Sequence, residues 1–229
     1  MGVLQSGLYT EFTWCSNHVA ASGANQVYLL VEWRGSTARP KKHIPKSKRI
    51  AEQVQLHLQL GMGAKLSALY GCRVEILNEF NYTIGLGSLY EEDDRQIVLG
   101  FDFAPCSSGV HPMVTALWTF KDSSHREIIL PSHTISLQFS NHTALLFRKV
   151  NPRVEKCIKI LQNSEVLENA LIAFERGYSE RGGEMIRRRA DEMLLLAIRL
   201  EDIDYLQEAE ILYNLSDTFI NTYGAVAVG

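Results

Sequence analysis

The segment at residues 27–33 constrains the fold more than any other part of this sequence. Its residues, Val-Tyr-Leu-Leu-Val-Glu-Trp, are almost continuously apolar and rich in types that favour strands. A strand with this composition is buried on both faces and belongs in the centre of a sheet. The rest of the chain must therefore supply the strands that pair with it and the layers that cover it.

Further segments of the first half have strand composition, and turn residues separate them. They are residues 8–14, 72–77, 95–103, 110–120 and 127–139, the last of which Pro131 interrupts. The turn residues fall at 21–25, 85–87, 91–94, 105–109 and 121–124. About six to eight strands joined in this way predict an antiparallel β-sandwich over residues 1–150.

Residues 48–70 interrupt these strands with a spacing typical of a helix. Ile50, Val54 and Leu58 recur every four residues, and Ser47 has the side chain of an N-cap. A pair of glycines follows the apolar series and would end the helix. We therefore predict a helical insert near residues 48–70 of the sandwich.

A basic linker at residues 35–49 precedes this insert. It holds six Lys or Arg side chains and no acidic one. Such a run can contact nucleic acid or an anionic surface. Pro40 and Pro45 discourage regular structure, however, and no aromatic ring interleaves the charges. We predict an exposed linker.

The second half, residues 151–229, has helical periodicity. Asn151 and Pro152 form a start signal, because Asn caps a helix and Pro at the first position has no N–H to leave unpaired. Apolar residues then recur at helical spacing, with an irregularity predicted at Asn163, a helix end at Gly177 and a break at Gly182. The predicted fold class is α+β: an antiparallel β-sandwich followed by a C-terminal helical hairpin or three-helix unit.

Composition limits the classes of function. The chain has 229 residues and a net charge of −3, and neither half has the basic excess of a nucleic-acid or membrane-binding protein. The start of the chain has no charged segment followed by an apolar one, so we predict a cytoplasmic protein. Cys15, Cys72, Cys106 and Cys157 form no C-x-x-C pair, and we expect free, mostly buried thiols.

No residues are predicted to form a catalytic, cofactor-binding or metal site. His125, His133 and His142 lack the close ligand pairs of a zinc site, and a G-x-S-x-G elbow is missing. Gly85 and Gly87 lack the third glycine of a dinucleotide fingerprint, so a hairpin turn is expected there. The acidic run at residues 91–94 has neither the glycine nor the spacing of a calcium loop and predicts a solvated turn.

Two other groups of side chains have structural explanations. The arginines at residues 187–189 have acidic neighbours at helical spacing and are expected to form ion pairs. Trp14, Trp33 and Trp118 fall on strand patterns and are expected in the core.

The order of these segments resembles bacterial von Willebrand factor type A (VWA) domain proteins. Residues 27–33 are similar to the strand that precedes the metal-binding domain in that family, and residues 50–60 and 72–77 to the segment that follows it. The best match is at residues 85–103, where Gly-Leu-Gly-Ser-Leu and an acidic turn lead into an alternating strand. Residues 170–177 and 190–200 resemble the C-terminal helices of the family.

The resemblance fails where the VWA domain itself would lie. Family members bind a divalent cation through Asp-x-Ser-x-Ser, whereas residues 122–126, Asp-Ser-Ser-His-Arg, depart from it at the fifth position. No metal ligand is carried over. The resemblance implies a sandwich without its inserted domain, which requires that Trp33 and Ile50 lie close together in one scaffold.

The favoured function is a non-enzymatic protein–protein interaction scaffold without a cofactor. It would have a protein partner and bind neither nucleic acid nor membrane. Formation of a homo-oligomer, with the acidic helices around residues 201–204 at the interface, is one alternative. One alternative is a hydrolase or metalloenzyme with a site assembled from Asp, His and Ser in the sandwich. Another is a carbohydrate-binding sandwich, which requires an exposed Trp14 or Trp118.

Overall fold

A computed structural model of the chain describes residues 2–5, 8–35, 48–72, 74–76, 80–91, 93–146 and 150–224. The chain divides into two compact units, residues 1–157 and 158–229. The boundary therefore falls within a helix, a little beyond the predicted position at residue 150. Most of the basic linker predicted at residues 35–49 lies outside the described residues.

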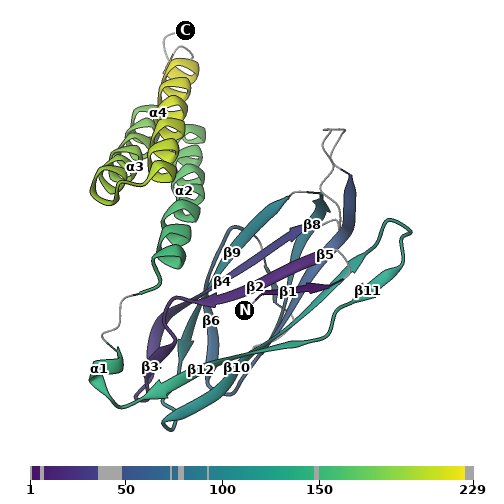
Figure 1. Cartoon of the computed structure of the whole chain (residues 1–229). Helices are drawn as coiled ribbons and strands as arrows, with labels where there is room; N and C mark the ends of the chain where they lie inside the picture. Colours follow the sequence, from purple (N-terminus) through teal and green to yellow (C-terminus); the bar gives the residue numbers. More distant parts are fainter. Residues whose placement is uncertain are drawn as a thin grey trace. The chain divides into compact units, whose positions relative to one another are not determined.

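The first unit is a β-sandwich of two sheets (Figure 1). Sheet A contains, in spatial order, β1 (Gly2–Gln5), β2 (Leu8–Trp14), β4 (Ala24–Gly35), β9 (Asp94–Phe103) and β6 (Ala64–Tyr70). Sheet B contains β3 (His18–Ala20), β12 (His133–Ser140), β10 (Gly109–Lys121), β5 (Arg49–Leu60), β8 (Asn81–Tyr90) and β7 (Val74–Ile76), and β11 (Glu127–Ile129) pairs with β10. The pairs are antiparallel except for β3 with β12.

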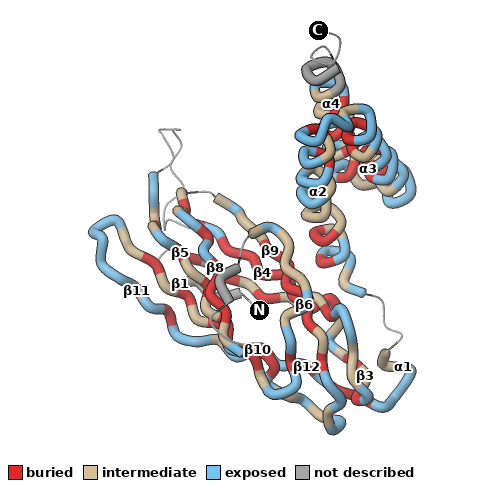
Figure 2. The backbone as a smooth tube through the Cα atoms, turned by 180° about the vertical axis from the view of Figure 1, so that it is seen from behind, coloured by how far each residue is buried: buried red, intermediate tan, exposed pale blue. Residues whose placement is uncertain are grey.

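The predicted central strand lies in the middle of sheet A. β4 pairs with β2 on one side and β9 on the other, and its side chains from Leu29 to Trp33 are buried. Figure 2 shows the same pattern as long buried stretches along β4 and β9. The prediction of an α+β fold with an antiparallel sandwich is confirmed. The described residues contain twelve strands, more than the six to eight predicted.

The predicted helical insert near residues 48–70 is wrong. These residues form β5 and β6, one strand in each sheet. A spacing of four fits a helix, but it is also two strand repeats. Val54, Leu56, Leu58 and Leu60 are all buried, which is the period of two that identifies a strand.

The predicted hairpin at Gly85 and Gly87 is also wrong. Both glycines lie inside β8, where the register with β5 shifts on either side of Val54. Gly87 has φ +75° and Gln53, on the facing strand, has φ 50°. The glycines therefore serve an irregularity in the sheet rather than a chain reversal.

The ends of β4 and β5 lie together at one end of the sandwich. A Cβ atom at Gly35 would stand 2.7 Å from the Ile50 side chain and 2.4 Å from the Tyr90 carbonyl oxygen. The turn after β8 holds both ends, because Gly35 N donates to Asp93 O and Glu91 N to Lys48 O. The two strands thus belong to one scaffold, as the insertion hypothesis requires.

Four helices complete the described residues: α1 (Thr143–Leu146), α2 (Pro152–Glu175), α3 (Ser179–Leu200) and α4 (Ile203–Gly224). Asn151 caps α2 as predicted, since its Oδ1 accepts a hydrogen bond of 3.0 Å from Arg153 N. Gly177 follows the end of α2 with φ +82°. The second unit is a three-helix unit formed by α2 from residue 158 onward, α3 and α4.

Two predicted helix interruptions are wrong, and packing explains both. α2 continues through Asn163, whose buried side chain bonds to α3 and α4 instead of ending the helix. Gly182 lies within α3, where a Cβ atom would approach Ala170 O and the Phe174 ring of α2 to 2.9 Å. Glycine therefore permits the close contact of α2 with α3.

We expect Gly182→Ala to destabilise the helical unit. Alanine improves helix propensity by up to about 1 kcal/mol. Overpacking against a backbone oxygen and a ring costs roughly 1–3 kcal/mol, so the net effect should be a loss of about 1 kcal/mol. Urea unfolding followed by the helical circular dichroism signal measures it. Glu184→Ala, on the exposed side of α3, is the control, and a gain in stability at residue 182 would contradict the tight contact.

Candidate functional site

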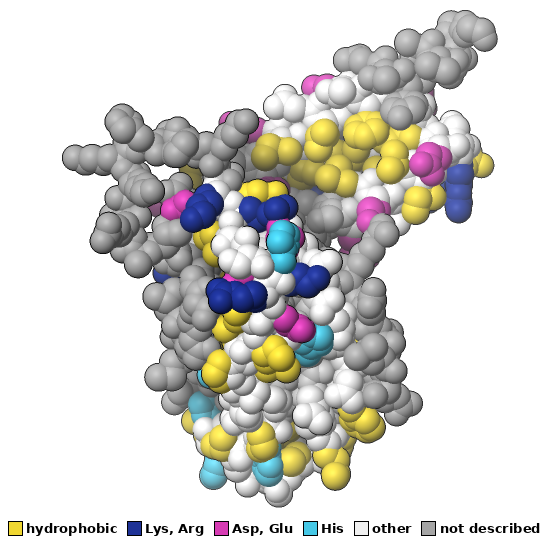
Figure 3. All heavy atoms as spheres, turned by 90° about the vertical axis from the view of Figure 1, so that its right-hand side faces the viewer, with side chains coloured by type: hydrophobic (Ala, Val, Ile, Leu, Met, Phe, Trp, Pro, Cys, Tyr) yellow, Lys and Arg dark blue, Asp and Glu magenta, His cyan; other side chains and the backbone are white. Residues whose placement is uncertain are grey.

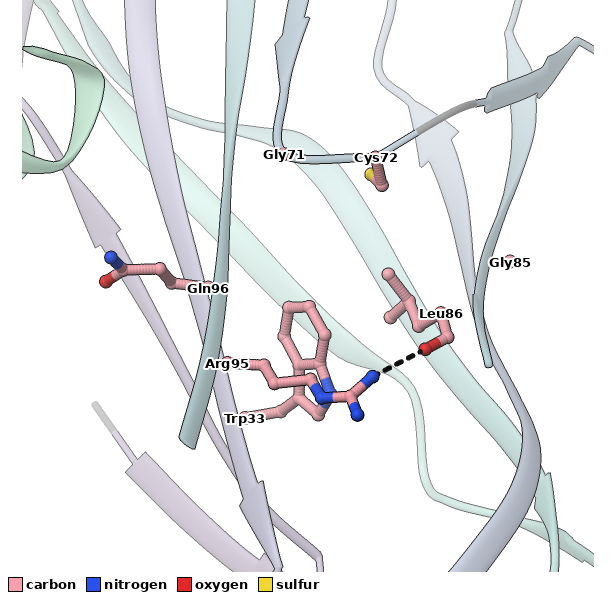
Figure 4. A pocket seen from close by; sticks show the side chains of 7 residues that line it. All are labelled: Trp33, Gly71, Cys72, Gly85, Leu86, Arg95 and Gln96. Carbon is pink, nitrogen blue, oxygen red and sulfur yellow. Dashed lines mark hydrogen bonds between the residues drawn. The ribbon is translucent and has the colours of Figure 1, made fainter. Parts of the chain in front are cut away.

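A cleft of about 460 Å³ opens between the two sheets of the sandwich (Figure 4). Sheet A contributes Trp33, Arg95 and Gln96, and sheet B contributes Gly85 and Leu86. Gly71 and Cys72 close it where the chain leaves β6. Because β8 carries glycine here, no side chain of residue 85 fills this part of the cleft, and a Cβ atom at Gly85 would meet no atom within 4 Å.

The charged group of the cleft is already bound by the protein. Arg95 donates to Leu86 O at 3.2 Å and to Asp93 Oδ2 at 2.9 Å. Figure 4 shows the first of these bonds spanning the cleft from β9 to β8. The guanidinium therefore ties the two sheets together, and its charge is compensated by Asp93 rather than offered to a ligand.

The thiol of the cleft is a weak nucleophile. Burial raises the pKa of Cys72 to about 11, so the side chain is protonated at neutral pH. Reactive cysteines instead have pKa values lowered by a neighbouring positive charge, base or helix N-terminus. The chemistry of the cleft supports binding of a small apolar group better than covalent catalysis.

A polar group lies on the other face of sheet A, beneath the first turns of α2. Arg153 donates to Glu32 Oε1 at 2.5 Å, and Cys157 Sγ donates to Gln96 Oε1 at 3.2 Å. Burial raises the pKa of the Glu32 carboxyl group, although the charge of Arg153 partly opposes this. These bonds join the start of α2 to β4 and β9.

The histidines considered as metal ligands lie apart, each in its own surroundings. His133 stacks on Phe12 with 5.4 Å between ring centroids, and His125 Nδ1 lies 3.5 Å from Glu52. Backbone N–H of His142 donates to Ser140. Across the described ranges, no group of three or more His, Cys, Asp or Glu side chains could hold a metal ion.

Sequence reasoning missed His57. Its Nδ1 lies 3.0 Å from Thr83 Oγ1 and its Nε2 lies 2.9 Å from Thr119 Oγ1, so it joins three strands of sheet B. The alternation of apolar and polar residues within β5 places His57 on the outer face of sheet B. The helix predicted for residues 48–70 did not show this alternation. With both ring nitrogens occupied, it has no nitrogen to give a ligand.

The tryptophans lie in the core, as expected. Trp33 and Trp118 pack with their ring centroids 5.8 Å apart, and Trp14 Nε1 donates to Ser136 O across the sandwich. Trp14 is 7% exposed and Trp118 is 2% exposed. The carbohydrate-binding alternative required one of these two to be exposed, and neither is.

The arginines at residues 187–189 differ from the predicted local ion pairs. Arg189 does pair with Glu192, but it is buried and also bonds to Asn163 Oδ1 and Lys159 O of α2. Arg187 bonds to Asp217 of α4. Both arginines therefore fix α3 against its neighbours.

At residues 122–126, Asp122 accepts hydrogen bonds from the backbone N–H groups of Ser124 and Arg126, which makes a tight turn.

Exposed apolar side chains are concentrated on the helical unit. Thirteen large hydrophobic side chains are exposed among the described residues, and eight of them belong to residues 158–229. Those eight are Leu171, Ile172, Tyr178, Leu195, Ile198, Leu200, Ile203 and Ile211. Figure 3 shows hydrophobic side chains gathered over this part of the chain. No described helix has the length and apolar character needed to cross a membrane.

Comparisons with known proteins give only distant likenesses. No protein-family model and no curated protein matches the chain. It is similar to a von Willebrand factor type A structure from Catenulispora acidiphila at 17% identity and TM-score 0.48, over 66% of this chain and 36% of that one. It is similar to the ArnB paralog VWA2 from Sulfolobus acidocaldarius at 10% identity and TM-score 0.43, over 76% and 42%.

A third likeness is to the collagen-binding domain from a Staphylococcus aureus adhesin. The identity is 8% and the TM-score 0.36, over 56% of this chain and 96% of that one. The chain spans less than half the length of the two von Willebrand structures.

Cys72 should react slowly with alkylating reagents at neutral pH. A pKa of about 11 leaves roughly a hundredfold less thiolate than an ordinary thiol, because each pKa unit changes the fraction tenfold. Iodoacetamide labelling followed by peptide mass spectrometry measures the rate, with the urea-unfolded chain as the control. Labelling of the folded chain as fast as the unfolded one would contradict the raised pKa of this thiol.

The Glu32 carboxyl group should make the sandwich less stable as pH rises above about 4.5. Its pKa is higher in the folded than in the unfolded state, so the folded state binds more protons between the two values. The stabilisation that Glu32 contributes is fully present below its unfolded pKa. It decreases between the unfolded and the folded pKa and is constant above the folded pKa. The change corresponds to about 1.4 kcal/mol per unit of pKa difference.

Glu32→Gln removes this titration while keeping the shape of the side chain. The measurement is the difference in unfolding free energy between the native chain and the variant, taken from pH 4 to pH 7. We expect the native chain to lose stability relative to the variant as pH rises. A difference that stays constant would show that Arg153 balances burial, and one that changes in the opposite direction would show that Arg153 outweighs it; either would contradict the prediction.

Proposed function

We propose that the chain is a non-enzymatic protein-interaction scaffold whose contact surface lies on the helical unit. The concentration of exposed apolar side chains on residues 158–229 carries this proposal. Monomeric soluble proteins rarely expose contiguous apolar patches, and those that do commonly use them to bind other proteins. Leu171 and Ile211, at 42% and 52% exposed, belong to this surface.

In this proposal the sandwich is the frame of a VWA-type protein without its cation-binding module. The order of its segments supports this, as does the contact of Gly35 with Ile50, which allows a domain to be inserted between β4 and β5. The sequence contains no Asp-x-Ser-x-Ser. Partner binding is therefore proposed to be independent of divalent cations.

The cleft in the sandwich favours a binding protein over a hydrolase. Asp93 and Leu86 O occupy Arg95, and Cys72 is a protonated thiol. A hydrolytic site would instead need a nucleophile within hydrogen-bond reach of a base. His57 lies within this reach of the Thr83 and Thr119 hydroxyls, but none of these three residues lines the cleft.

Affinity capture with surface variants tests the proposal. The immobilised full chain is exposed to extract of the cells that naturally produce it, with and without a chelator of divalent cations. Leu171→Glu combined with Ile211→Glu changes the helical surface, and Val110→Glu combined with Ile129→Glu is the matched pair on the sandwich. All four side chains are exposed, so both pairs should leave the fold intact.

We expect at least one partner whose recovery falls about tenfold or more with the helical pair and stays unchanged with the sandwich pair. The chelator should make no difference. Partners lost only with the sandwich pair, or recovered only with a divalent cation, would contradict the proposed contact surface.

A further inference from the structure

A stripe of apolar side chains runs along the seam between α2 and α4. We define the α2–α4 stripe as Ile160, Leu167, Leu171, Ile211 and Leu215. The two helices are in contact, because Asn163 Nδ2 donates to Glu208 Oε2 at 2.8 Å and the Phe174 and Phe219 rings stack with centroids 4.7 Å apart. Both contacts join residues 45 positions apart, so α2 and α4 run parallel.

Helical spacing places the stripe beside these contacts. Ile160 and Leu167 lie one turn before and after Asn163, and Leu171 lies one turn before Phe174. In α4, Ile211 follows Glu208 by one turn. Three members pack partly against the core of the unit, while Leu171 and Ile211 are 42% and 52% exposed. The stripe is thus the outer edge of a core that remains open on this side.

The spacing within the stripe is that of a helix–helix interface. Ile160, Leu167 and Leu171 are separated by seven and then four residues, the steps that keep side chains on one face for a partner helix. From Ile160 to Leu171 the stripe extends about 16 Å, or three helical turns. A fourth helix lying in the seam would contact both α2 and α4 along this length.

The exposed charges within one turn of Leu171 are acidic. α4 contains four Asp or Glu residues and no Lys or Arg, and one of the four, Asp217, pairs with Arg187 of α3. On α2, Glu168 and Glu175 are exposed within one turn of Leu171, and Asp204 is exposed at the start of α4. Most of the arginines of the unit are on α3 instead. A helix with basic side chains beside its apolar face would complement this surface, and an acidic one would be repelled.

We infer that the α2–α4 stripe binds an amphipathic helix of a partner protein, with basic side chains flanking its apolar face. This inference rests on the proposed interaction function and names the class of partner and the place where it binds. The helix completes a four-helix arrangement by burying Leu171 and Ile211. Its basic side chains lie against Glu168 and Glu175.

Designed peptides test the inference on the full chain. One peptide is an amphipathic helix with leucines on one face and lysines beside them, and the matched peptide has glutamates in place of the lysines. Fluorescence anisotropy at about 50 mM salt, where screening is weak, gives the two dissociation constants. We expect the lysine peptide to bind at least about tenfold more tightly, and the ratio to shrink in high salt.

Variants locate the binding and reverse the charge preference. Ile211→Glu should weaken the lysine peptide about tenfold, whereas Ile198→Glu, away from the stripe, should change it less than about twofold. Glu168→Lys combined with Glu175→Lys should shift the preference towards the glutamate peptide. This exposed pair keeps the test valid should Ile211→Glu reduce folding, which circular dichroism detects.

The outcomes separate this inference from the proposed function. Equal binding of the two peptides, or binding that Ile211→Glu leaves unchanged, overturns the stripe as the site. Should Ile198→Glu weaken binding while Ile211→Glu does not, the helical unit still provides the contact surface and only the stripe is rejected. Binding that neither variant weakens, and that the sandwich pair Val110→Glu with Ile129→Glu abolishes, overturns both.

Discussion

Aromatic side chains of the two sheets meet inside the sandwich, and the positions of the other strands depend on this contact. Trp33 of sheet A packs on Trp118 of sheet B, and Phe103 packs on Phe139, with centroids 5.8 and 5.9 Å apart. These rings are nearly inaccessible to water, so they supply much of the apolar area buried on folding. They also fix which strands face each other. The cleft opens beside Trp33, where Gly85 replaces a side chain.

Sequence alone predicted the strands whose pattern has one interpretation. β2 and β9 were expected within a residue or so of their bounds, because alternating apolar residues and turn residues agree there. β5 was not expected, because the spacing of four between Ile50, Val54 and Leu58 fits both the period of a helix and twice the period of a strand. Leu56 and Leu60 decide between the periods, but their burial depends on the facing sheet, which no local pattern contains. The glycines of β8 present the same difficulty, since bulges and turns both use them.

The candidate sites were harder to predict than the fold. The cleft gathers Trp33, Cys72, Leu86 and Arg95 from distant parts of the chain, and only the pairing of strands brings them together. The same holds for Glu32 and Arg153, separated by 121 positions and joined by one ion pair. The helical repeats that form the stripe were visible in the sequence. Their exposure was not, because Asn163 and Gly182 have the residue types of helix interruptions, and the packing of three helices is not visible in a local pattern.

Charge is distributed unevenly over the helical unit. Arg189 and Arg187 of α3 bond to the neighbouring helices and so use the positive charge of α3 inside the unit. α4 has no basic residue of its own, and among its acids Asp217 pairs with Arg187 of α3. Like charges along one surface repel and lower the stability of the free unit. A partner that brings positive charge and apolar area to this surface would relieve the repulsion and cover Leu171 and Ile211 in one step. The same arrangement therefore accounts for the exposed apolar stripe and for the acidic side chains around it.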